Sequence, residues 1–157
     1  MVMDQTMLIT RLNWFYSLEL NQIDLYMSQY GNFLGSYESI VFERTAFIEQ
    51  EHVDNIAAQI RKLGGSPTKL GDVLSPILGK VAGSILSISG LENVLKANIL
   101  IEQKAMNDYT ELINTIQDNY GPELKKVLQH NLVDEDTHTA WFTMRLADYD
   151  NSVLVDS

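Results

Sequence analysis

Six residues in this sequence form a repeated pattern of potential metal ligands. In each half of the chain a lone glutamate is followed, 30 or 33 residues later, by a Glu-x-x-His motif. The three-residue separation within each motif places a carboxylate and an imidazole on the same face of an α-helix. Such residues, projecting inward from four helices, are the ligand set of a dinuclear metal site in a helical bundle. The six residues are Glu19, Glu49, His52, Glu102, Glu135 and His138.

Each of these residues occurs in the middle of a run of apolar residues with helical spacing, whose side chains are expected to face the core. A single glutamate at such a position is usually solvated, but this does not explain six ligand-type residues in a repeated order. Ionised carboxylates resist burial side by side, whereas two divalent cations balance the charge of four carboxylates. We therefore expect two metal ions per chain. Carboxylate and imidazole ligands favour iron, with manganese as an alternative.

Three further residues are expected to support the ligands. The glutamates of the two Glu-x-x-His motifs should bridge the ions, and each lone glutamate should bind one ion. Asp134 is positioned to accept the free ring N–H of a ligating histidine, His52, from across the bundle. The alternative for Asp134 is an exposed acid beside Asp136. Tyr26 and Tyr109 each follow a lone glutamate by seven residues, so each hydroxyl is expected to bond a ligating carboxylate.

Helical periodicity dominates the chain, and glycine and proline mark the breaks between helices. Short turns join the first two helices and the last two, so each pair should be antiparallel. The middle connection is long enough for a crossover. We predict a single all-α domain over residues 1–157, a four-helix bundle with one long apolar crossover. The expected helices span residues 4–30, 36–63, 91–120 and 122–148, with a flexible tail at 149–157.

The crossover allows two interpretations. Between Val73 and Leu91 its only charged residue is Lys80. It either forms a short helix that covers the bundle core, or it acts as an apolar lid that admits a hydrophobic substrate. The lid could also rest on a membrane surface, but the few lysines nearby would make that peripheral contact weak. The sequence alone leaves both interpretations open.

The composition excludes several classes of function. The chain has 157 residues, a formal net charge of −10 and no cysteine. The acidic balance argues against nucleic acid as a partner. The absence of cysteine excludes disulfides, thiolate metal sites and a thiol nucleophile. No apolar run reaches the length of a membrane-spanning helix, and the N-terminus lacks the features of a signal peptide. We expect a cytoplasmic protein that forms a homo-oligomer.

The sequence resembles the ferritin-like superfamily, and within it is most similar to the demethoxyubiquinone hydroxylases. The similarity is carried by residues 19–26 (ELNQIDLY), Glu49-Gln-Glu-His52, Pro67-Thr68-x-Leu70 and Asp134-Glu135-x-x-His138. The resemblance implies a diiron centre that reacts with O₂ or H₂O₂ and hydroxylates a quinone-like substrate. The chain departs from the family pattern at Tyr16-Ser17-Leu18, before the first ligand, and at Ser66, where arginine is usual.

Three other functions fit the same ligand pattern. Rubrerythrins are the next most similar proteins, which suggests a peroxide reductase. However, their additional glutamate on the third ligand helix corresponds to Ala105, and no cysteine is present for a rubredoxin-like module. A ferroxidase or iron-handling protein is the third possibility. The last is a metal-binding bundle that does not turn over a substrate.

Overall fold

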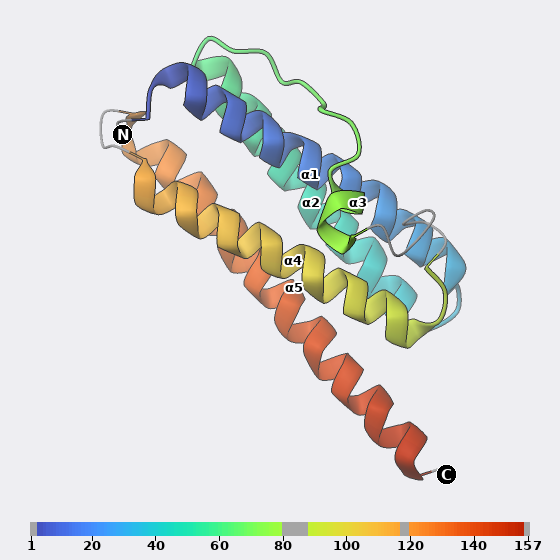
Figure 1. The fold of residues 1–157 in the computed structure, drawn as a ribbon. Coiled ribbons are helices and arrows are strands. Elements are labelled where there is room, and N and C mark those ends of the chain that lie inside the picture. Colours follow the sequence, from blue (N-terminus) through green and yellow to red (C-terminus); the bar gives the residue numbers. More distant parts are fainter. Residues whose placement is uncertain (1–2, 80–87, 117–119, 156–157) are drawn as a thin grey trace.

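The computed structural model describes residues 3–79, 88–116 and 120–155, which form helices and no strand. Four long helices pack as two antiparallel pairs, α1 with α2 and α4 with α5, and after α2 the chain runs back along the bundle to α3 (Figure 1). This confirms the predicted all-α bundle with one crossover. The helices are α1 (Gln5–Asn32), α2 (Tyr37–Lys62), α3 (Leu74–Leu78), α4 (Leu91–Thr115) and α5 (Pro122–Val155).

The starts of the long helices follow from local chemistry. Asp4 caps α1, where its side chain accepts a hydrogen bond of 2.8 Å from the main-chain N–H of Met7. Ser36 caps α2 in the same way through the N–H of Ser39, at 3.2 Å. Both side chains satisfy N–H groups that have no partner within the first helical turn. Pro122 opens α5, where its missing N–H costs nothing.

The end of α5 differs from the sequence prediction. We expected this helix to stop near Asp148, and that boundary is wrong because α5 continues to Val155. The C-terminal part of α5 projects beyond the other helices (Figure 1). Residues 151–155 are exposed, so no inward-facing apolar pattern marks this turn of helix in the sequence. No glycine or proline follows Pro122 to interrupt the helix.

The first part of the crossover is held against the bundle. Main-chain groups of residues 68–71 bond to the side chains of Asn13, Ser17 and Asn21 on α1, at 2.7, 2.8 and 3.0 Å. These three side chains are spaced four residues apart, so they form one polar stripe along α1. The stripe satisfies main-chain groups of a segment that has no helical hydrogen bonds of its own.

The short helix α3 supports the covering interpretation for the part of the crossover that it occupies. It contacts α4 and α1. Leu74 is buried, and Ile77 and Leu78 pack against the core. Residues 80–87, which include Lys80 and the apolar positions expected to form the rest of a lid, lie outside the described residues. The lid interpretation therefore stays a prediction. Within the described ranges, no helix has both the length and the apolarity that crossing a membrane requires.

A buried pair of amides links α1 to α4. Gln29 Nε2 donates to Asn98 Oδ1, and Asn98 Nδ2 donates back to Gln29 Oε1, both at 2.8 Å. Both side chains are buried. Each amide satisfies the other, so the pair specifies how the two helices are aligned without leaving a polar group unpaired.

The amide pair yields a stability prediction. Asn98→Leu should lower the free energy of unfolding by about 1–3 kcal/mol, because the buried Gln29 amide loses its partner. The double variant Gln29→Leu/Asn98→Leu should recover most of this loss, because no unpaired amide remains. Urea unfolding of the two single variants and the double variant measures both effects. Additive losses in the double variant would show that the amides are not energetically coupled.

Candidate metal centre

The four long helices bring all six predicted ligands into the centre of the bundle. α1 and α4 each contribute one glutamate, and α2 and α5 each contribute a glutamate and a histidine from consecutive turns. The four glutamates have no exposed surface, and the two histidines are buried. The structure assembles them into two overlapping groups of potential ligand atoms, each with its atoms within 4.8 Å of one another. The groups are Glu19, Glu49, His52 and Glu135, and Glu49, Glu102, Glu135 and His138.

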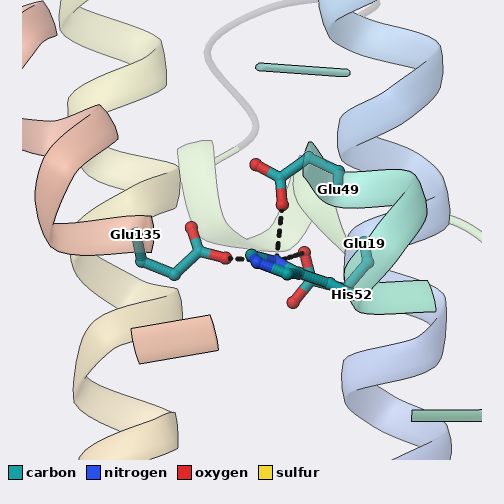
Figure 2. A group of neighbouring side chains, drawn as sticks. All are labelled: Glu19, Glu49, His52 and Glu135. Carbon is teal, nitrogen blue, oxygen red and sulfur yellow. Dashed lines mark ion pairs between the residues drawn. The ribbon is translucent and has the colours of Figure 1, made fainter. Parts of the chain in front are cut away.

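The first group is centred on the ring of His52 (Figure 2). Its Nδ1 atom lies 2.9 Å from Glu49 Oε2, 3.3 Å from Glu135 Oε1 and 3.7 Å from Glu19 Oε2. The three carboxylates approach from α1, α2 and α5, so residues far apart in the sequence converge on one point.

The second group repeats this arrangement around His138. Its Nδ1 atom lies 3.2 Å from Glu49 Oε1, 3.6 Å from Glu102 Oε1 and 4.0 Å from Glu135 Oε2. Glu49 and Glu135 thus belong to both groups, and each directs one carboxylate oxygen to each histidine. This is the placement expected of two carboxylates that bridge two metal ions.

The spacing and the missing hydrogen bonds of the candidate ligand atoms are better explained by metal coordination than by contacts among the ligands themselves. A metal–ligand bond of about 2.1 Å places neighbouring ligand atoms about 3.0–3.4 Å apart, close to the separations around His52. Within the described residues, the ligand atoms include several buried oxygens and nitrogens without a hydrogen-bond partner, among them both oxygens of Glu49 and of Glu135 and the Nδ1 atom of each histidine. Buried polar atoms are rarely left unpaired. Two cations would satisfy them together.

Without metal, the pKa values of the site show that its carboxylates cannot all remain ionised when they are buried together. Burial and the charge of Glu49 raise the pKa of Glu19 to about 8. Burial and the surrounding carboxylates, Glu102 foremost, also raise the pKa of Glu135 well above its ordinary value. Burial opposes a charge on His138, but Glu102 and Glu49 outweigh it and raise its pKa to about 10. Protons therefore supply positive charge where no metal does, and metal binding should displace them.

The pKa of Glu49 shifts in the opposite direction to the pKa values of Glu19 and Glu135. Burial alone would raise its pKa, but the imidazoles of His138 and His52 lower it to about 2. This carboxylate stays ionised between the two histidines. A permanently ionised oxygen pair at the middle of the site is suited to bridging two cations.

Asp134 makes the contact expected of it. His52 Nε2 lies 3.0 Å from Asp134 Oδ2, and this hydrogen bond lowers the pKa of the Asp134 carboxyl. An ionised Asp134 accepts the Nε2 proton, so the lone pair of a neutral His52 is on Nδ1 and faces the carboxylates. His138 differs, because its buried Nε2 has no hydrogen-bond partner among the described residues.

The two tyrosines bond carboxylates of the candidate metal centre on the opposite helix. Tyr26 of α1 donates to Glu102 of α4, and Tyr109 of α4 donates to Glu19 of α1. Burial, followed by the charge of the bonded glutamate, raises the pKa of each phenol, so both remain protonated donors. Asn131 donates to the Tyr109 hydroxyl at 3.1 Å. The sequence does not predict this hydrogen bond. It shows only that Asn131 lies on the inner face of its helix, one turn before Glu135.

The electrostatics of the site yield a prediction about metal-dependent stability. In Glu135→Gln, the metal-free melting temperature should stay within about 2 °C of the wild type, because burial keeps the Glu135 carboxyl neutral. Saturating Mn²⁺ should raise the melting temperature of the wild type by roughly 5–10 °C, the effect of a ligand at about a hundredfold its dissociation constant. The variant should lose most of this rise.

Glu51→Gln provides the matched control, since Glu51 is an exposed residue on the same helix as Glu49. Its melting temperature should respond to Mn²⁺ as the wild type does. Equal Mn²⁺ effects in Glu135→Gln and the wild type would show that the buried carboxylates do not bind the metal.

Comparison with known proteins identifies the family and the fold of the chain. The family model described as the ferritin-like domain matches residues 11–151. A search of curated proteins gives no match. Among solved structures, the chain is similar to a bacterioferritin of Desulfovibrio desulfuricans whose diiron site was studied in different catalytic states, with a TM-score of 0.78 and 20% identity over 94% of this chain and 82% of that one. That likeness shows the fold, and the family match shows membership: the chain belongs to the ferritin-like domain family.

Proposed function

We propose that this chain binds two iron ions and uses them as a redox cofactor that reacts with O₂ or H₂O₂. The observation that carries the proposal is the placement of Glu49 and Glu135, each with one oxygen near each histidine. Iron ions held close together supply reversible one-electron chemistry and the activation of oxygen. Manganese would satisfy the same ligands and is the alternative metal.

The protein's own residues prepare the centre for this role. The carboxylates offset the charge of the cations, and the histidines bind as neutral ligands. Asp134 sets the orientation and tautomer of His52. Tyr26 and Tyr109 hold Glu102 and Glu19 by hydrogen bonds, so these glutamates keep their direction when their other oxygens bind metal. The four surrounding helices keep bulk water from the site, which strengthens each of these electrostatic interactions.

Two substrates have specific support. The likeness to a bacterioferritin with a diiron site favours Fe²⁺ itself as the substrate, in a ferroxidase or iron-handling role. The resemblance of the ligand motifs to demethoxyubiquinone hydroxylases favours a quinone-like ring that is hydroxylated. A rubrerythrin-like peroxide reductase has less support, because Ala105 stands where those proteins are expected to carry a further glutamate.

Rapid mixing of the anaerobic Fe²⁺-loaded protein with each oxidant tests the proposal. The wild type should oxidise two iron ions per chain with O₂ or H₂O₂. Glu49→Gln should react roughly a hundredfold more slowly or not at all, because it loses a ligand shared by both ions. Glu51→Gln should match the wild type. A wild type that binds iron but reacts with neither oxidant would contradict the redox function and leave a binding role.

The same experiment separates the substrates. Continued oxidation of Fe²⁺ added in excess of two ions per chain would favour iron handling. Consumption of a short-chain hydroquinone together with O₂, with a hydroxylated product, would favour the hydroxylase. Fast reaction with H₂O₂ that a hydroquinone does not change would favour the peroxide reductase.

A further inference from the structure

Two hydrogen bonds define how α1 and α4 face each other beside the metal centre. Tyr26 donates to Glu102, and Tyr109 donates to Glu19. The ring of Phe15 also stacks on that of Tyr109, with centroids 4.1 Å apart. The two helices therefore run antiparallel to each other. This alignment determines which residues lie between the two hydrogen bonds.

Gln22 occupies the α1 position between them. It follows Glu19 by three residues and precedes Tyr26 by four, so it shares their face of the helix. Its side chain has no exposed surface. Gln22 therefore lies on the inner side of α1, between the carboxylate of Glu19 and the hydroxyl that bonds Glu102.

Ala105 occupies the matching position on α4. It follows Glu102 by three residues and precedes Tyr109 by four, and it is fully buried. A methyl group at this position fills little of the space between the helices. In the antiparallel alignment Ala105 lies close to the level of Gln22, so a small side chain occupies the inner face of α4 near the long side chain of Gln22.

The amide of Gln22 has no partner. Among the described residues, neither its Nε2 nor its Oε1 makes a hydrogen bond. Gln29, two turns later on the same face, has both amide atoms bonded to Asn98. An unpaired buried amide is costly and uncommon, so its presence beside a ligand site calls for a specific explanation.

We propose that the Gln22 amide donates a hydrogen bond to a small acceptor, such as water, hydroxide or a two- or three-atom anion, held between Glu19 and Glu102. The histidines come from α2 and α5, so this α1–α4 side of the centre is the side without an imidazole. A small polar molecule here would satisfy the amide and approach the metal ions between the two lone glutamates. The inference rests on the proposed function in one respect, namely that the centre holds iron.

Azide binding tests this inference, because azide is a small anion that accepts hydrogen bonds and changes the absorbance of ferric sites. In Gln22→Leu, the oxidised protein should still hold two iron ions per chain but bind azide roughly ten- to a hundredfold more weakly, the effect of losing a hydrogen bond to a charged group. Ala105→Leu should weaken azide binding in the same way by filling the space. The metal-free Gln22→Leu protein should unfold at a urea concentration no lower than the wild type.

Gln59→Leu is the matched control, because Gln59 is a buried glutamine on α2, outside the α1–α4 seam. It should leave azide affinity unchanged. Azide affinity of Gln22→Leu within twofold of the wild type, with iron content intact, would overturn the inference and leave the proposed function standing. Loss of iron from Gln22→Leu, or a lower urea midpoint, would also overturn it, since Gln22 would then support the ligands or the fold. A wild type that holds no iron would refute both.

Discussion

The burial of four carboxylates at one point is the constraint on which the rest of this structure depends. Glu19, Glu49, Glu102 and Glu135 have no exposed surface, and repulsion between them must be offset within the bundle. Without metal, the site compensates with protons, as the raised pKa values of Glu19, Glu135 and the histidines show. Two cations would offset the same charge and occupy donor atoms that have no hydrogen-bond partner among the described residues. The polar groups around the site then serve to orient the ligands.

The bundle is built from two similar halves, but its candidate metal centre is not symmetric. Each half contributes one lone glutamate, one Glu-x-x-His motif and one tyrosine that bonds across to the other half. Asp134 holds His52, whereas among the described residues His138 has no equivalent partner. The two halves also differ where Gln22 on α1 corresponds in spacing to Ala105 on α4. The two candidate metal positions therefore differ in their surroundings, which would allow two bound ions to take different roles.

The sequence predicts the fold and the convergence of the six candidate ligands, because both depend on helical spacing. A three-residue interval determines which face of a helix a side chain occupies, so the repeated motifs identify the inner faces. Spacing does not determine which neighbouring helix a side chain meets. Tyr26 and Tyr109 were therefore expected to bond carboxylates, but their partners on the opposite helix became clear only from the packing. For the same reason, the unpaired amide of Gln22 is invisible in the sequence. The end of α5 was missed because an exposed helical turn carries no apolar pattern.

Anomalous X-ray diffraction at the iron absorption edge tests the central claim most directly. Crystals of the iron-loaded protein should show two anomalous peaks inside the bundle. One should lie among Glu19, Glu49, His52 and Glu135, and the other among Glu49, Glu102, Glu135 and His138. Both should be within bonding distance of Glu49 and Glu135. Iron-loaded crystals with no peak inside the bundle, while the six side chains keep their positions, would contradict the claim that these residues form a dinuclear metal centre.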